Sequence, residues 1–321
     1  MCTCVDPSSR ETPMRRTVRA LLCVTALAAS ALLTAPAGAT AAPAVDTAVH
    51  TITSHAVPAQ IDAYWTPQRM ANAKPMTADP AALTARASVA ATGTPRYVPA
   101  IKPKAAVTAS LAPSEWVTIG RLYFSIPGNG DWQCSGNVVA SNNRDVVATA
   151  RHCVMNIDTG QTYNNFHFAP SYNRGNAPYG WWNWRSMGWR IDDRGPGGDN
   201  AFIVMTTGGN SGGHIVDAVG GSGLGFNWAT NNYAHAIGLP ASLDYAVWCE
   251  GQPYDGPSGG VQIPNCNGLS GGASGGAFIV NYQPSDGSAM QTASYFGTWG
   301  DSYFAYYRDA AYQVWSGAQG A

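Results

Sequence analysis

The residues best suited to covalent chemistry lie in a stretch of small residues near the end of the chain. This stretch, CNGLSGGASGGAFIVN, covers residues 266–281 and holds two overlapping copies of Gly-x-Ser-Gly-Gly-Ala. Glycines on both sides of a serine allow a tight bend and bring backbone N–H groups close to a ligand. A serine in such a bend can attack a carbonyl carbon while neighbouring amides hold the oxyanion. The stretch therefore predicts a nucleophile loop that leads into a strand.

Two serines of this loop fit the role of nucleophile. Ser274 stands shortly before the apolar run 278–280, a short strand that would anchor the loop, whereas Ser270 is followed only by more loop. We predict that Ser274 is the nucleophile and that the N–H groups of Gly272 and Ser274 form the oxyanion hole. Ser270 is the alternative nucleophile, and a plain Gly/Ser-rich surface turn is the competing interpretation of the whole stretch.

A histidine and an aspartate earlier in the chain could serve the serine as general base and orienting carboxylate. His152 ends the strand-like run VATARHC, and its backbone would be fixed if the adjacent Cys153 is in a disulfide. Asp199 stands directly before the apolar run AFIVM, so its carboxylate could be buried at the start of a strand and accept the imidazole N–H. A structural histidine and an ordinary turn aspartate are the competing interpretations.

Together the three motifs resemble those of the chymotrypsin-like serine proteases. TARHC is similar to the family's T-A-x-H-C, DNAFIV to its D-x-A segment and GASGGAF to its G-x-S-G-G-P, in the family's order of His, Asp and Ser. The segments IGRLYFS, CSGNVV and FHFAP resemble the bacterial secreted branch that includes glutamyl endopeptidases. The resemblance covers residues 116–321.

The resemblance implies a double β-barrel with the site in the cleft between the barrels. It makes His152 the general base and then the acid, Asp199 its orienting partner and Ser274 the nucleophile, with no metal and no cofactor. Ala273 stands where the family usually has an aspartate that pairs with a freed N-terminus. If activation is proteolytic, it must therefore act by removing a pro-segment.

The resemblance also implies where the substrate's side chain would bind. The expected pocket residues are Gly268, Leu269, Ser294, Tyr295 and Phe296. No carboxylate lies between Cys266 and Ser274, which disfavours Arg or Lys at the cleavage position. Glutamyl-specific relatives carry a histidine where this chain has Ala293. We therefore expect an apolar or small pocket.

The composition changes along the chain and predicts three parts. Residues 1–39 are typical of an export signal, with arginines, an apolar run at 20–33 and small residues at 37–39. The apolar run is short for a transmembrane anchor, which is the weaker interpretation. Residues 40–115, rich in Ala, Pro and Thr, predict a largely irregular pro-segment or linker. Residues 116–321 would be the catalytic domain.

The last part carries the pattern of an all-β fold. Many short strand-like runs alternate with Gly, Asn and Pro turns, which indicates a barrel or sandwich. The resemblance specifies this as two antiparallel six-stranded β-barrels. The run 303–315 is the helix candidate, because its aromatic residues recur three and four positions apart, and we expect it to form a C-terminal helix.

The cysteines point to an oxidising compartment. Of the seven cysteines, those beyond the signal form two sequence-local pairs, Cys134 with Cys153 and Cys249 with Cys266, although the residues alone permit three connectivities. The resemblance implies the bond from Cys134 to Cys153. A zinc site is disfavoured because no C-x-x-C or H-x-x-x-H spacing occurs.

Charge narrows the partners. The formal net charge is −1, all three lysines precede residue 116 and acids outnumber the arginines after it, so nucleic acid is excluded as a partner. We expect a secreted monomer that acts on polypeptides, interacts with its own pro-segment before maturation and binds no membrane after signal removal.

These expectations give one leading hypothesis and two alternatives. The leading hypothesis is a secreted serine endopeptidase that works through an acyl-enzyme. A catalytically silent protease-like binding protein is one alternative, because Ala273 is an irregular neighbour for the serine. An esterase or wall-peptide hydrolase on the same fold is the other.

Overall fold

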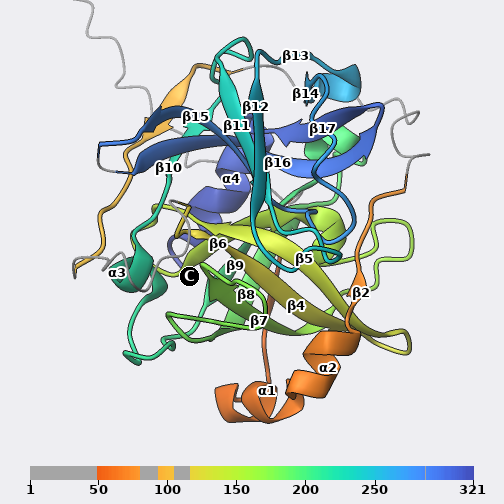
Figure 1. Cartoon of the computed structure of the whole chain (residues 1–321), viewed down its shortest axis with the longest axis vertical. Coiled ribbons are helices and arrows are strands. Elements are labelled where there is room, and N and C mark those ends of the chain that lie inside the picture. The colour runs from red at the N-terminus through yellow and green to blue at the C-terminus, as the bar shows by residue number, and fades with distance from the viewer. Residues whose placement is uncertain (1–48, 80–92, 105–115, 286) are drawn as a thin grey trace, which may run out of the picture. The chain divides into compact units, whose positions relative to one another are not determined.

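The computed structural model describes residues 49–79, 93–104, 116–285 and 287–321 (Figure 1). All of them belong to the unit Val45–Ala321. The predicted export signal, residues 1–39, lies outside the described residues, as do parts of the predicted pro-segment. Among the described residues, every helix is too short or too polar to cross a membrane.

Buried strands between residues 119 and 205 close into a six-stranded barrel. The strands are β4 (Ile119–Ile126), β5 (Gly130–Val138), β6 (Val146–Ala150), β7 (Asn164–Pro170), β8 (Trp182–Arg190) and β9 (Asn200–Met205). Their order is β8-β7-β4-β5-β6-β9, and the pairing of β8 with β9 closes the ring. Every residue of β4, β6 and β9 is buried, as expected for strands with a filled barrel on one face and other elements on the other. The first predicted barrel is therefore confirmed.

The second half of the chain forms a curled sheet (upper part of Figure 1). Its strands are β10 (Gly223–Phe226), β11 (Ala234–Gly238), β12 (Val247–Gly251), β13 (Tyr254–Asp255), β14 (Val261–Ile263), β15 (Ala277–Gln283), β16 (Ser288–Trp299) and β17 (Asp301–Tyr306), together with β3 (Arg96–Val98). The order is β12-β11-β15-β16-β17-β14-β13, with β10 on β16 and β3. The end strands β12 and β13 are not paired with each other in the described part of the chain. This sheet is thus a half-barrel in place of the second closed barrel that the sequence predicts.

The C-terminal helix is present, but it begins later than the sequence pattern indicates. Helix α4 spans Asp309–Ala318, whereas the first residues of the predicted helix, 303–306, belong to β17. β17 pairs with β14 on one edge and β16 on the other, and all of its residues after Asp301 are buried, so both of its faces are covered. A fully buried aromatic strand shows no alternation, and periodicity cannot distinguish it from a buried helix.

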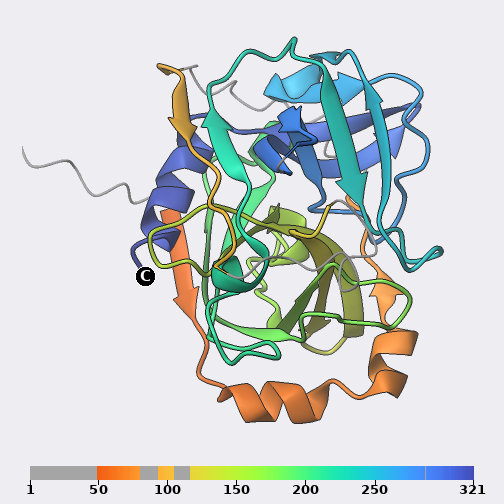
Figure 2. The ribbon, with the colours of Figure 1, turned by 60° about the vertical axis from the view of Figure 1, so that its left-hand side comes forward.

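Helix α4 packs on the first barrel. Val314 and Trp315 are buried in a cluster with Phe202 and Val204 of β9. Figure 2 shows β1 (Val49–Thr53) beside this helix, on the same flank of the barrel. The chain's last helix therefore covers the strand that follows Asp199.

The described part of the predicted pro-segment is more regular than the sequence indicates. It forms β1, α1 (Pro58–Tyr64), α2 (Pro67–Asn72), β2 (Lys74–Pro75) and β3. β1 pairs with β8, and β2 pairs in parallel with β5. Ile61 and Trp65 are 1% and 4% exposed within the first barrel's hydrophobic cluster. Several apolar residues of the described part, Ile61 and Trp65 among them, are thus buried against the barrel.

Two disulfides join the predicted pairs, Cys134–Cys153 and Cys249–Cys266. The first links β5 to the turn after β6. The second links β12 to the loop before the Gly/Ser-rich stretch. Each therefore fixes a segment next to one of the predicted catalytic loops.

Candidate active site

Strands β6 and β9 bring His152 and Asp199 together. In their antiparallel register Ala150 lies opposite Asn200, so the residues after β6 lie beside the residues before β9. His152 lies in the 3₁₀ turn η2 (Arg151–Cys153), and Asp199 ends the turn η3 (Pro196–Gly198). The imidazole Nδ1 of His152 is 2.6 Å from Oδ2 of Asp199, and the His152 backbone N–H donates to Oδ1 at 2.9 Å.

This contact determines the protonation pattern of the neutral histidine. The Asp199 side chain is 4% exposed and an ionised carboxylate can only accept hydrogen bonds, so the proton of a neutral His152 lies on Nδ1. Nε2 is then an acceptor. Nε2 is buried and has no hydrogen-bond partner among the described residues. A buried, unpartnered basic nitrogen is available to take a proton from a neighbouring group.

The turn that carries Asp199 is held by a buried arginine. Arg151 donates to the backbone carbonyls of Arg190, Asp193 and Gly195. Its Nε is 4.0 Å from Oδ1 of Asp199, and burial lowers the pKa of this guanidinium while the Asp199 charge opposes the shift. Four carboxylate and carbonyl partners thus surround one cation at the base of the turn.

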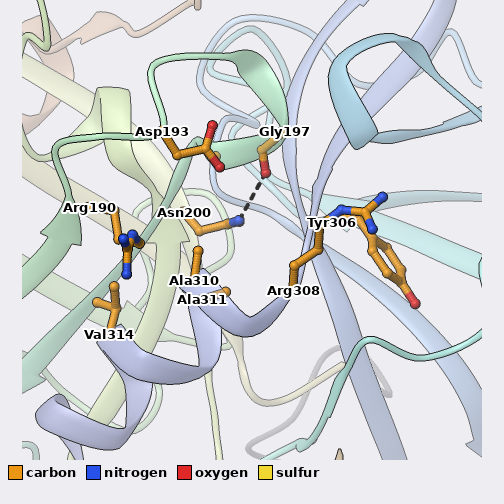
Figure 3. A pocket seen from close by; sticks show the side chains of 10 residues that line it. Arg190, Asp193, Gly197, Asn200, Tyr306, Arg308, Ala310, Ala311 and Val314 are labelled. Carbon is orange, nitrogen blue, oxygen red and sulfur yellow. Dashed lines mark hydrogen bonds between the residues drawn. The ribbon is translucent and has the colours of Figure 1, made fainter. Parts of the chain in front are cut away.

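Helix α4 supports the same turn from outside. Figure 3 shows Gly197, Asn200 and Asp193 facing Ala311 and Val314 of α4 across a small pocket. The Asn200 side-chain amide donates to the Gly197 carbonyl at 3.4 Å. Residues near the end of the chain therefore lie close to the turn that precedes Asp199.

Glycines let the Ser274 loop approach the histidine turn. Gly272 and Gly275 have φ of 92° and 80°, which favours glycine. A Cβ on Gly275 would lie 2.1 Å from Thr149 Oγ1 and 2.9 Å from the nitrogen of Ala150, two residues before His152. The Ser135 N–H also donates to the Ser274 carbonyl at 2.7 Å. Ser274 is thereby fixed to the strands that precede His152, and it is 1% exposed.

The serine hydroxyl contacts a backbone carbonyl from the N-terminal segment. Ser274 Oγ donates to the carbonyl oxygen of Met76 at 3.4 Å. The same oxygen accepts the N–H of Gly272 at 3.0 Å. A peptide carbonyl therefore lies between the predicted nucleophile and a predicted oxyanion-hole amide. No hydrogen bond joins Ser274 Oγ to His152 Nε2 in the described part of the chain.

Ser270 lies on the rim of the neighbouring pocket. It is exposed, and its carbonyl accepts the N–H of Ala273 at 2.9 Å, which closes the turn before Ser274. Ser270 therefore helps to shape the nucleophile loop, whereas Ser274 is the serine whose hydroxyl meets the peptide carbonyl.

A cavity of about 470 Å³ opens beside Ser274. It is lined by Leu269, Ser270, Gly271, Ser274, Tyr295, Gly297, Thr298 and Trp299, with Thr77 and Ala78 from the N-terminal segment. None of these side chains is charged. Burial raises the pKa of Tyr295 to about 12, so its hydroxyl stays neutral, and it contacts Thr298 Oγ1 at 2.7 Å.

The expected pocket residues divide between two cavities. Leu269 and Tyr295 line the cavity beside Ser274, and Phe296 lines an adjacent one of about 200 Å³ with His152. Gly268 and Ser294 line neither of them: Gly268 is in an exposed turn, and Ser294 shares a hydrogen bond with the buried Tyr307 hydroxyl.

The expected pocket residues did not include six that line this cavity: Gly271, Gly297, Thr298 and Trp299, with Thr77 and Ala78 from the N-terminal segment. Residues 297–299 continue β16 beyond the expected segment. The sequence signal that could have found residues 297–299 was the length of the strand-like run that forms β16.

The imidazole of His152 also lies near the sulfur atoms of Cys134 and Cys153, with all ligand atoms within 4.8 Å. These two sulfurs are bonded to each other, so they offer no thiolate. The cluster is therefore a rigid support for the histidine, and its donor set does not suit a metal ion.

Solved structures with a similar fold are chymotrypsin-like serine proteases. A thermostable serine protease from an extremophilic microorganism has 29% identity and a TM-score of 0.59, over 65% of this chain and 100% of its own. The protease Anisep from Arthrobacter nicotinovorans has 26% identity and a TM-score of 0.56, over 70% and 100%. A Glu endopeptidase has 16% identity and a TM-score of 0.52, over 68% and 98%, which shows the fold alone.

No protein-family model matches the sequence, and no curated protein matches it. The support for the resemblance to this family therefore comes from the comparison of structures. This chain has the chymotrypsin-like serine protease fold.

Proposed function

We propose that this protein is a secreted serine endopeptidase that hydrolyses peptide bonds through Ser274, His152 and Asp199. The observation that carries the proposal is the peptide carbonyl held between the Gly272 N–H and the Ser274 hydroxyl, next to a histidine whose other nitrogen is bound by a buried carboxylate. These groups are the ones that acyl transfer to a serine requires. The similarity to serine proteases supports the same reaction class.

In the proposed reaction, Ser274 Oγ attacks the substrate's carbonyl carbon while Nε2 of His152 takes the hydroxyl proton. The N–H groups of Gly272 and Ser274 stabilise the oxyanion, and Asp199 stabilises the imidazolium. His152 then gives the proton to the leaving amine, and the C–N bond breaks to leave an acyl-enzyme. Water attacks the acyl carbon, His152 takes its proton and returns it to Ser274, and the acid is released.

The compartment and the substrate preference follow from separate observations. The two disulfides and the predicted export signal support secretion. The uncharged lining beside Ser274 supports a preference for uncharged side chains over Arg, Lys or Glu at the cleavage position.

The test is covalent labelling by a fluorophosphonate, followed by mass spectrometry of tryptic peptides. In protein from which the predicted pro-segment, residues 40–115, has been removed, we expect labelling of the wild type at Ser274, no labelling of Ser274→Ala and retained labelling of Ser270→Ala. Labelling that survives in Ser274→Ala but is lost in Ser270→Ala would reverse the assignment. Absence of labelling under every condition, in folded protein, would instead favour the silent binding protein.

Turnover separates the enzymatic alternatives. We expect cleavage of an unfolded protein substrate and of peptide amides. Hydrolysis of simple esters with no cleavage of any peptide would favour the esterase.

A further inference from the structure

Residues 73–79, which we call the strap, cross the cleft beside the proposed nucleophile. The strap begins at the edge of β5, where Pro75 pairs with Gln133 and the Met76 N–H donates to the Gln133 carbonyl at 3.0 Å. The Gln133 side-chain amide donates to the Ala73 carbonyl at 2.7 Å. The strap is therefore an added strand on the first barrel.

From β5 the strap continues to the second sheet. Met76 offers its carbonyl to Gly272 and Ser274, and Thr77 and Ala78 then line the cavity beside Ser274. Ala78 is 7% exposed and belongs to a cluster with Phe296 and Tyr303, against which Trp299 packs. The strap therefore fills the predicted oxyanion site and one wall of the predicted substrate pocket together.

Gly271 gives the strap room to lie flat on the nucleophile loop. A Cβ at this position would be 3.1 Å from side-chain atoms of both Pro75 and Thr77. These are tight contacts, so the loop backbone and the strap fit each other closely.

The strap does not lie in the cleft as a substrate would. In a productive complex the residue that carries the attacked carbonyl also places its side chain in the primary pocket. Met76 supplies the carbonyl, but its side chain belongs to the first barrel's hydrophobic cluster with Ala73. The pocket is contacted by Thr77 and Ala78, which follow Met76 and would belong to the leaving group. The chain direction is thus opposite to that of a substrate.

The strap also gives the serine hydroxyl a hydrogen-bond partner other than its proposed base. Ser274 Oγ donates to the Met76 carbonyl, and His152 Nε2 is left without a partner among the described residues. With its hydrogen bond made to the Met76 carbonyl, the hydroxyl is not paired with His152.

We infer that the strap is a built-in inhibitor that binds the cleft in a non-productive direction and keeps the full-length chain latent until it is displaced. This inference rests on the proposed function, because it states how that same site is regulated. The occupant of the cleft is the chain's own segment, residues 73–79.

The experiment displaces the strap in the full-length chain. Ala78→Glu places a charge among aromatic rings where it cannot be buried without cost. Ala63→Glu, on the exposed surface of α1, makes the same change away from the cleft. A second variant, Gln133→Leu, removes the hydrogen bond to Ala73 and weakens the strap from its other end. Near-UV circular dichroism establishes that each variant is folded.

Two readouts keep the strap and the catalytic assignment separate. One is the rate of fluorophosphonate labelling, which we expect to rise at least about tenfold in Ala78→Glu and to rise in Gln133→Leu, but not in Ala63→Glu. The other is hydrogen exchange of the Gly272 amide, which we expect to be slow in the wild type and faster in the same two variants. A synthetic peptide of residues 73–79 should slow the labelling of Ala78→Glu again.

Each outcome supports or overturns the inference. Measurable labelling at the same rate in wild type and Ala78→Glu, with faster Gly272 exchange in the variant, overturns latency. Equal exchange in both proteins overturns the strap contact itself. Faster exchange with no labelling of any form supports the strap and overturns the proposed catalysis. A wild-type fragment that ends at Met76 in intact-mass spectra would show productive binding and overturn the non-productive direction.

Discussion

The guanidinium of Arg121 donates a hydrogen bond to the backbone carbonyl of Gly272 at 3.4 Å, from a position with no solvent exposure. Arg121 also donates to the carbonyls of Leu239 and Pro240, and Asp244 lies 3.5 Å away. The Ser135 hydroxyl donates to the same Gly272 carbonyl at 2.9 Å, and the Gly272 N–H donates to the Met76 carbonyl at 3.0 Å. Arg121 and Ser135 together thus hold the Gly272 carbonyl of the nucleophile loop.

Replacing Arg121 should therefore impair both stability and turnover. In the Ala78→Glu background we expect Arg121→Met to lower kcat more than it changes KM, because the Gly272 amide loses its orientation. Unpaired buried carbonyls should also lower the free energy of unfolding by about 3 kcal/mol. Peptide-ester kinetics and urea unfolding measure the two effects.

Arg96→Met is the matched control, because Arg96 is 46% exposed and lies 3.9 Å from Asp309. It should change neither quantity appreciably. A normal kcat in Arg121→Met would contradict the positioning role.

Asp199→Asn should reduce kcat by about 10⁴-fold while the fold persists. An asparagine can donate its N–H₂ to Nδ1, which favours the tautomer with the proton on Nε2 and removes the base. Asp192→Asn is the control, because Asp192 is a half-exposed partner of Arg190 that does not contact His152. Steady-state kinetics of both variants test this prediction. A decrease in kcat of less than tenfold in Asp199→Asn would argue against the proposed pairing of His152 with Asp199.

Gly275→Ala should be far more damaging than Gly300→Ala. Both glycines have a similar positive φ, 80° and 82°, but a Cβ on Gly275 would lie 2.1 Å from Thr149 Oγ1, whereas nothing lies within 4 Å of one on Gly300. We expect Gly300→Ala to cost about 1 kcal/mol from its backbone conformation alone. Gly275→Ala should cost more and should also lose labelling at Ser274. Thermal unfolding and labelling rates test this, and equal effects in the two variants would refute the close-approach argument.

His167 should make the protein less stable in acid. Burial lowers the pKa of His167 to about 4, its Nδ1 contacts Asn183 Oδ1 at 2.7 Å, and its ring stacks on Trp181. The nearest carboxylate, Asp62, is 3.9 Å away and favours the charged form only weakly. The folded pKa lies below the ordinary 6.5, so the unfolded chain binds the proton more readily.

The stabilisation from neutral His167 is therefore complete above pH 6.5 and is lost as the pH falls towards 4. The loss amounts to about 3 kcal/mol. Urea unfolding at several pH values between 7 and 4 should show a flatter dependence for His167→Gln than for the wild type. Parallel curves for the two proteins would contradict the assignment of this loss to His167.

The sequence by itself determined the fold class and the candidates His152, Asp199 and Ser274, and it favoured the two sequence-local cysteine pairs without fixing their connectivity. Each depends on short-range patterns: strand-like runs, turn glycines and residues fixed at the end of a strand. The first barrel, the disulfides and the contact of His152 with Asp199 agree with those patterns. Local signals suffice where a residue's environment is set by its sequence neighbours.

Only the tertiary structure decided which distant residues contact the candidate catalytic residues and the nucleophile loop. Met76 contacts Ser274 across 198 positions, and Arg121 reaches Gly272 across 151. The start of α4 and the burial of Ile61 and Trp65 likewise depend on partners supplied by distant strands. No local pattern encodes such contacts, because they arise when separate apolar surfaces are buried together and each backbone group must find a partner in the folded chain.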